Sequence, residues 1–334
     1  MKKFPPAQIL DLDKYSASKL VALKRLLVSG SPVNLMLGAG TSVSAGVPTW
    51  DALLRRIVNT YFIHWKLTKE RATKPPPTNI SIALVGEFFE HMHGDALPED
   101  SSPLRTQDPL LVAQQIKNCI CEMDWRYLLN KTLYPEDRFV KGKKVSSQLL
   151  SKLAYLCKAY PNISRVINYN FDSLFSEHLI DIGLRPQILW KGKPEKHTKS
   201  GISIFHPHGY LPFGGGPCSE IILAENQYHS EYLSPYSWGN LAQSRAMLDD
   251  ICIFVGLSMS DPNMRRILRA SREITEAVHY CFLFTESKDR KPIDEEVLFD
   301  YDMRRLGIRV IRIPYKNDYQ KYDRLHELIE YIAR

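Results

Sequence analysis

One stretch limits what this chain can fold into: an apolar run followed directly by small residues. Val33–Leu37 predicts a buried strand, which Gly38 and Gly40 end in a tight turn. Small residues continue to Gly46, and glycine both permits positive φ angles and lets a pyrophosphate approach the main chain. A helix is expected soon after Pro48. Its apolar positions follow at spacings of three and four: Trp50, Leu53, Leu54 and Ile57. Strand, turn and helix in this order predict a dinucleotide site.

Gly38-x-Gly40 by itself also fits a tight turn that binds no ligand. The next glycine, Gly46, comes six residues after Gly40. A standard Rossmann fingerprint has it three residues after, and no Lys-Ser/Thr pair follows here as in a P-loop. On these two glycines alone, both interpretations stay open.

Apolar runs of strand length recur along the chain and alternate with helical patterns. The further predicted strands are residues 163–168, 202–205, 221–223, 251–255, 280–284 and 308–313. Amphipathic helices are predicted over residues 7–30, 49–72, 80–93, 108–131 and 319–332. The alternation predicts an α/β fold with a doubly wound, mostly parallel Rossmann-like sheet, in a single domain over residues 1–334. The first helix could pack on the sheet or on another subunit.

Polar side chains follow the predicted strand 163–168, in Tyr169-Asn170-Phe171-Asp172. Ligand sites of doubly wound sheets form at such strand ends. Asn170 could instead cap the helix that follows. Asn168 offers a rival register for the same motif.

The predicted strand 202–205 leads into His206-Pro207-His208-Gly209. An imidazole takes up a proton near neutral pH, as a general base must. A histidine at a strand end is more often structural than catalytic, and His206 competes with His208 for a functional role. Only His208 is followed by glycine.

The predicted strand 251–255 ends in a segment that runs from Gly256 to Asn263 and contains Ser-x-Ser-Asp-Pro. Gly256 leaves room for a ligand, and the Ser258 hydroxyl can hydrogen-bond a ribose. Asp261-Pro262 is typical of a helix start, so a capping role is favoured for Asp261 over ligand contact.

Four of these motifs, in this order, resemble those of the sirtuin superfamily. Gly-Ala-Gly-x-Ser-x-x-Ala-Gly-x-Pro-x-Trp is similar to its first NAD-binding motif, and Trp50-Asp51-x-Leu53-Leu54 looks like the bacterial defence-type branch. The resemblance implies catalytic roles for Asn170 and His208. It implies NAD-binding positions at Gly38, Ala39, Gly40, Thr41, Ser42, Pro48, Trp50, Asp172, Gly256 and Ser258. Tyr169 departs from the pattern of both branches.

Sirtuin-like folds carry a small inserted domain, which the resemblance places at residues 75–145 as a helical subdomain. Sirtuin deacylases hold theirs together with a zinc ribbon of two Cys-x-x-Cys pairs. This chain has six cysteines and no such pair, so the sequence predicts no metal and argues against protein deacylation. The resemblance then implies an NAD+ glycohydrolase that depletes NAD as an antiphage defence effector. An NAD or ADP-ribose sensor without turnover, and a protein deacylase, stay open.

Composition and charge limit which ligands and which cellular compartment are expected for the protein. The net charge of +7 fits attraction to a phosphate-bearing ligand, and the basic clusters lack the stacking aromatics of single-strand binders. Nucleic acid is therefore expected to act only indirectly. No apolar run approaches the roughly 20 residues of a membrane span, and no signal peptide is recognised, so a cytoplasmic protein is expected. The resemblance implies a homo-oligomer and a separate regulatory partner, such as a helicase-like ATPase or an Argonaute.

Overall fold

A seven-stranded sheet forms the centre of the protein. The structure is a computed structural model and describes residues 11–49, 52–53, 56–57, 109–118, 122–135, 139–140, 143, 145–196, 201–286 and 294–334. The strands are β1 (Val33–Leu37), β2 (Ile163–Asn168), β3 (Gln187–Leu189), β4 (Ser203–Phe205), β5 (Ile251–Val255), β6 (His279–Glu286) and β7 (Ile308–Tyr315). Their order is β3-β4-β2-β1-β5-β6-β7, and every pair is parallel. The predicted doubly wound α/β sheet is confirmed.

The strand β1 lies at the middle of this sheet and is buried along its whole length. It pairs with β2 on one side and β5 on the other, with Leu37 opposite both Asn168 and Val255. After β1 the chain therefore forms β2, β3 and β4 on one side of β1. It then crosses to the other side and forms β5, β6 and β7. Such a point of reversal is where open α/β sheets form a crevice for ligands.

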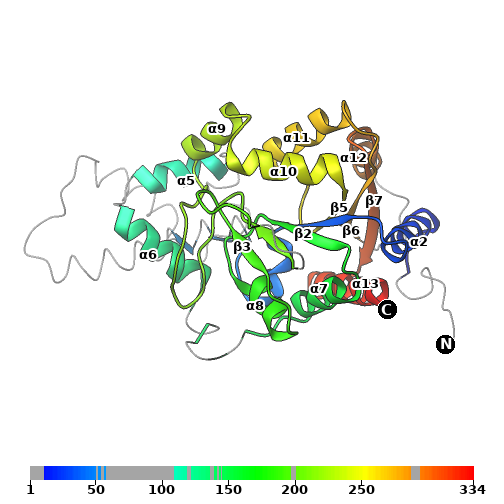
Figure 1. Cartoon of the computed structure of the whole chain (residues 1–334), viewed down its shortest axis with the longest axis horizontal. Coiled ribbons are helices and arrows are strands. Elements are labelled where there is room, and N and C mark those ends of the chain that lie inside the picture. Colours follow the sequence, from blue (N-terminus) through cyan, green and yellow to red (C-terminus); the bar gives the residue numbers. More distant parts are fainter. Residues whose placement is uncertain are drawn as a thin grey trace, which may run out of the picture. The chain divides into compact units, whose positions relative to one another are not determined.

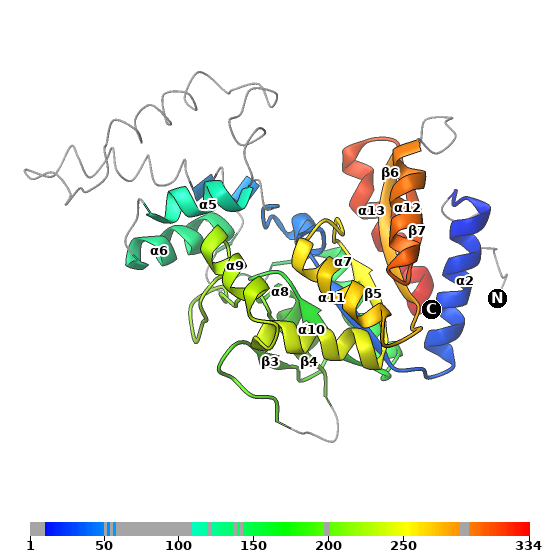
Figure 2. The ribbon, with the colours of Figure 1, turned by 90° about the horizontal axis from the view of Figure 1, so that it is seen from above.

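Helices cover both faces of the sheet (Figures 1 and 2). One face carries α10 (Trp238–Asp249), α11 (Pro262–Arg272) and α12 (Asp294–Arg305), and the other carries α7 (Gln148–Ala159), α8 (Leu174–Asp181) and α13 (Asp318–Ala333). Apolar side chains of α10 and α11, such as Met247 and Ile267, join Met36 and Phe254 in one buried cluster. This double cover explains why the central strands β1 and β5 are buried along nearly their whole length.

The helix α2 (Lys14–Val28) lies beside the edge strand β7 in both views (Figures 1 and 2). Its buried side chains include Leu20, Leu23 and Leu27, so its apolar stripe packs on the sheet. The Ser16 hydroxyl accepts a hydrogen bond from the backbone N–H of Arg312, a group of β7 that has no neighbouring strand. The helix therefore protects the sheet edge.

The described residues within 48–143, together with residues 222–230, form a second compact unit, separate from the unit that contains the sheet. Its described helices are α5 (Pro109–Asn118) and α6 (Glu122–Leu133), so the single helix predicted over 108–131 is two. Helix α9 (Glu225–Leu233) begins in this unit and ends in the other. Residues 52–53 and 56–57 are helical, and the predicted segment 80–93 lies outside the described residues. The predicted boundaries of the insertion, 75–145, stay a prediction.

Two further strand predictions differ from the structure. Residues 221–223 form no strand; Gln227 Oε1 accepts hydrogen bonds from the backbone N–H groups of Leu223 and Ala224, at the start of α9. The strand β3 was not predicted, because three residues of which only Leu189 is buried carry little pattern. None of the described helices is long and apolar enough to cross a membrane.

Candidate functional site

The turn after β1 packs directly against the turn after β5. The backbone N–H of Gly38 donates to Val255 O, and that of Gly40 donates to Gly256 O, both at 3.0 Å. A Cβ atom on Gly40 would lie 2.9 Å from Gly256 Cα, and one on Gly256 would lie 2.6 Å from Thr41 N. These glycines are therefore required where two main chains meet.

The conformation of this turn differs from the expected one. Gly38 has an extended backbone with φ of −119°, and Gly40 is not among the residues with positive φ. Positive φ values occur at Gly46 (94°) and Gly256 (69°) instead. Two short 3₁₀ helices, η1 (Ala39–Thr41) and η2 (Val43–Ala45), follow the strand.

The backbone donors of the turn are mostly engaged within the protein. Thr41 N donates to Gly38 O and Ser42 N donates to Ala39 O, in addition to the bond from Gly40 to Gly256. A pyrophosphate would have to share these N–H groups. The assignment of Gly38, Ala39, Gly40, Thr41 and Ser42 to pyrophosphate binding stays a prediction.

The side chain of Asn170 is hydrogen-bonded to residues 38–42, the turn after β1, which is called the glycine turn below. Its Nδ2 donates to Gly38 O at 3.0 Å, and it lies 3.1 Å from both Thr41 Oγ1 and Ser42 Oγ. Because a backbone carbonyl only accepts, the bond to Gly38 fixes which end of the amide is nitrogen. The opposite atom, Asn170 Oδ1, accepts no hydrogen bond from a described residue.

Asn170 is not the cap of α8. The hydrogen bond at the start of that helix comes from Asp172, whose Oδ1 accepts from Leu174 N at 3.0 Å. Asn168, which offered the alternative register for this motif, accepts a hydrogen bond from the Asn170 N–H through its Oδ1 at 3.1 Å. This bond fixes the backbone at Asn170. Asn170 reaches the glycine turn through its side-chain amide.

The second carboxylate oxygen of Asp172 is buried and has no hydrogen-bond partner in the part of the chain that the structure describes. Burial raises the pKa of Asp172 to about 6, although hydrogen bonds from Ser42 and from the Leu174 N–H lower it in part. A buried acceptor without a partner is costly in a folded protein. It is a feature that a ligand donor could satisfy.

The two histidines after β4 have different environments. The ring of His206 is buried, and its Nδ1 lies 2.8 Å from Asn170 O. Because that carbonyl only accepts, Nδ1 carries the proton. Burial lowers the pKa of His206 to about 4, so this ring is neutral at physiological pH. His206 therefore has a structural role. It connects residues 206–209, the His-Gly loop, to residues 169–172, the Asn170 loop.

His208 lies near two carboxylates, those of Asp261 and Glu231. Its ring meets the Tyr169 ring edge to face, with centroids 5.2 Å apart, and its Nε2 lies 3.9 Å from Asp261 Oδ2. Burial lowers the pKa of His208, and the carboxylates of Asp261 and Glu231 raise it in part. Gly209 is required here, since its φ is 106° and a Cβ would lie 2.2 Å from Glu220 O.

Asp261 has the predicted capping role: its Oδ1 accepts from Met264 N at 2.7 Å and starts α11. Its second oxygen faces His208, a contact that sequence reasoning missed. No local pattern could have found it, because the two residues follow strands that are not adjacent in the sheet. Ser258 is exposed, and its hydroxyl lies 2.7 Å from that of Ser260.

The structure thus brings most of the predicted residues to one edge of the sheet. Gly38, Thr41 and Ser42 contact Asn170, Gly256 packs on Gly40, and Tyr169 connects the Asn170 loop to His208. Two predicted residues are not placed with them. Pro48 is buried and belongs to the second unit, and Trp50 lies outside the described residues.

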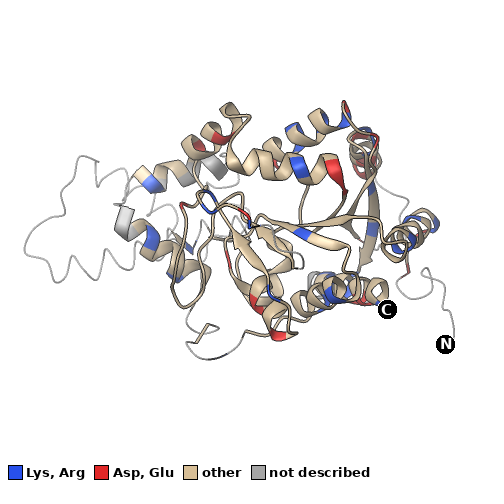
Figure 3. Ribbon diagram, viewed as in Figure 1, with Lys and Arg blue, Asp and Glu red and all other residues tan. Residues whose placement is uncertain are grey.

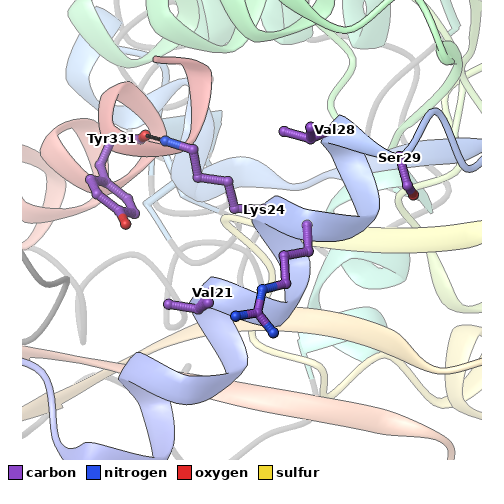
Figure 4. A pocket seen from close by; sticks show the side chains of 6 residues that line it. Val21, Lys24, Val28, Ser29 and Tyr331 are labelled. Atoms are coloured by element: carbon purple, nitrogen blue, oxygen red, sulfur yellow. Dashed lines mark hydrogen bonds between the residues drawn. The ribbon is translucent and has the colours of Figure 1, made fainter. Parts of the chain in front are cut away.

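A groove of about 310 Å³ lies elsewhere, between α2 and α13 (Figure 4). Lys24 Nζ crosses it to donate to Tyr331 O at 2.9 Å. None of the predicted site residues lines this groove. Among the described residues no cluster of three or more His, Cys, Asp or Glu side chains could hold a metal ion.

Charged residues of both signs occur on the described helices. Figure 3 shows basic residues on α2, α5 and α6 and acidic residues on α9 and α12.

The fold and its loops define the class: a doubly wound α/β protein with a candidate site at the reversal point of its sheet. Residues 164–304 match the family model of the SIR2-like domain, and this match supports assignment to the sirtuin-like superfamily. The match covers less than half of the chain. It includes Asn170, His208, Gly256 and Ser258 and leaves out the glycine turn after β1. No curated protein matches the chain.

Proposed function

We propose that this protein hydrolyses the bond between nicotinamide and ribose in NAD+, giving nicotinamide and ADP-ribose. One observation carries the proposal: Asn170 joins the glycine turn through its side chain and the His-Gly loop through its backbone carbonyl. A single residue thereby connects the motifs that the family resemblance assigns to NAD binding and to catalysis.

The reaction makes modest chemical demands. Nicotinamide leaves NAD+ as a neutral molecule, so no acid is needed to protonate it. Positive charge develops on the ribose as the bond breaks, water attacks the same carbon, and the water loses a proton. The site must therefore orient a water and a ribose, shield the charge and accept one proton.

The described residues fit these demands. Asn170 Oδ1 is an acceptor held in one orientation, suited to a ribose hydroxyl or the attacking water. His208 is partly exposed, and neighbouring carboxylates support its protonated form, so it is suited to accept the proton. Asp172 adds an acceptor without a partner beside Ser42, and its negative charge would favour the developing positive charge.

Incubation with NAD+ followed by chromatography and mass spectrometry tests the proposal. Nicotinamide and ADP-ribose are expected in equal amounts, and H208A should abolish both. Cyclic ADP-ribose would mean that an adenine nitrogen attacks in place of water. NAD+ recovered intact from a stable complex would favour a sensor, and nicotinamide release only with an acyl-lysine peptide would favour a deacylase.

We further propose a cytoplasmic defence role in which the activity is held in check until infection. Unregulated loss of NAD would kill the host, so an enzyme of this kind needs control. Self-association and a separate helicase-like or Argonaute-type partner are the proposed means. Assays of NAD loss with and without such a partner, after phage challenge of cells carrying wild type or H208A, test this role.

A further inference from the structure

We propose that Asp261 is a positioning residue, which holds the His208 imidazole and stabilises its protonated form during turnover. This inference rests on the proposed function, because it takes His208 as the group that accepts the proton. It goes beyond the capping role that the sequence predicts for Asp261.

The carboxylate of Asp261 has two oxygens with different partners. Oδ1 accepts from Met264 N at 2.7 Å, which fixes the side chain at the first turn of α11. With Oδ1 held, Oδ2 faces His208 Nε2 at 3.9 Å. The helix cap therefore orients a negative charge toward the imidazole.

This contact acts through charge, since 3.9 Å exceeds a hydrogen bond. The His208 side chain is 14% exposed and that of Asp261 is 22% exposed, so solvent screens the pair only in part. A carboxylate that orients a histidine and stabilises the imidazolium is a recurring device in hydrolases.

Two further groups adjoin His208. The Tyr169 ring packs against it, and the Tyr169 hydroxyl donates to Gln243 Oε1 at 2.7 Å, which steadies that ring. Glu231, on α9, is a second carboxylate that favours the protonated imidazole, and its Oε2 accepts from the Ser237 hydroxyl. Asp261 has the larger influence of the two carboxylates.

The test uses a substitution that keeps the cap. In D261N the amide oxygen still accepts from Met264 N, because Asn and Asp are equally good caps, while the charge is lost. E231Q is the matched control, since Gln still accepts from Ser237. D261A, which loses both cap and charge, separates a structural role: its Tm should fall, whereas that of D261N should stay near wild type.

The readout is the NMR titration of the His208 imidazole in the full chain without ligand, with H208A identifying its signal among the 10 histidines. The midpoint should fall by roughly one pH unit in D261N and by less in E231Q. In turnover, the acid limb of kcat/KM should move to lower pH in D261N, and the plateau should fall roughly three- to tenfold.

An unchanged His208 titration in D261N overturns the inference, as does a larger shift in E231Q. An altered titration with an unaltered pH profile of turnover also overturns it. If the titration shifts as expected in a protein that consumes no NAD+, the coupling of Asp261 to His208 stands and the proposed function fails.

Discussion

The side-chain amide of Asn170 donates a hydrogen bond to the backbone carbonyl of Gly38, 3.0 Å away, and thereby ties the end of β2 to the end of β1. The same nitrogen lies within hydrogen-bond distance of two hydroxyls of the glycine turn. The candidate site is therefore organised before any ligand binds, and Asn170 contributes to stability as well as to the proposed chemistry.

N170A should abolish NAD+ hydrolysis and also lower the free energy of unfolding by about 1–2 kcal/mol, because buried hydrogen bonds are lost. N168A is the matched control, since Asn168 is also buried and bonds to the backbone of Asn170. We expect N168A to cost similar stability and retain measurable turnover. Urea denaturation with NAD+ assays on both variants checks this. Full activity in N170A would remove Asn170 from the mechanism.

Alanine variants of the two histidines in the His-Gly loop should differ in turnover and in Tm. H208A is expected to lose turnover by at least about a hundredfold and to lower Tm by less than H206A, because the His208 side chain keeps 14% exposure whereas the His206 ring is buried. H206A should lower Tm by several degrees, because it leaves the buried Asn170 carbonyl without its partner. Thermal unfolding and kinetic assays of H208A and H206A test this prediction. Reversed phenotypes would assign the proton acceptor to His206.

Much of the architecture was predictable because it depends on local pattern. Runs rich in apolar residues indicated β1, β2, β5, β6 and β7, although Arg165 interrupts β2 and Arg309 and Arg312 interrupt β7. The same rule failed at residues 221–223, where an apolar run leads into α9 rather than joining the sheet. Only tertiary structure decides whether such a run finds a neighbouring strand.

The contacts of the site were less predictable. Asn170 and His208 were chosen from the sequence, but the Asp261–His208 contact depends on how the loops after β4 and β5 meet above the intervening strands. The glycines were predicted for a ligand, whereas the structure shows that Gly40 and Gly256 are needed for main-chain packing. Sequence indicates that a glycine is required and does not tell what approaches it.

G256A and G214A form a matched pair for that packing. Both glycines have positive φ, 69° and 79°, but a Cβ at Gly256 would meet Thr41 N at 2.6 Å, whereas nothing lies within 4 Å at Gly214. G214A should cost about 1–2 kcal/mol from backbone strain alone. G256A should cost several kcal/mol or prevent folding, because two backbones must separate. Chemical denaturation measures both, and equal costs would contradict the packing role.

Asp172 should make stability depend on pH in an unusual direction. The pKa of an aspartate is 3.8 when unperturbed, and burial raises that of Asp172 to about 6 in the fold. Between these values the folded protein keeps a proton that the unfolded chain releases, so Asp172 reduces stability as pH rises through this window.

D172N should therefore raise the free energy of unfolding at pH 8 by on the order of 1–3 kcal/mol, with the gain vanishing near pH 4. Asn retains an oxygen for the Leu174 N–H. If Asp172 serves the reaction, the stabler variant should also turn over more slowly. Urea denaturation of both proteins at the two pH values checks the stability. The same gain at both pH values would show that ionisation of Asp172 is not its cause.

The most direct measurement is the product analysis of NAD+ incubated in H₂¹⁸O with wild type, N170A and H208A, alone and with candidate partners. We predict nicotinamide and ADP-ribose carrying one ¹⁸O on the ribose carbon in wild type, and neither product in the two variants. NAD+ that stays intact under all these conditions, or equal product from all three proteins, would contradict the account.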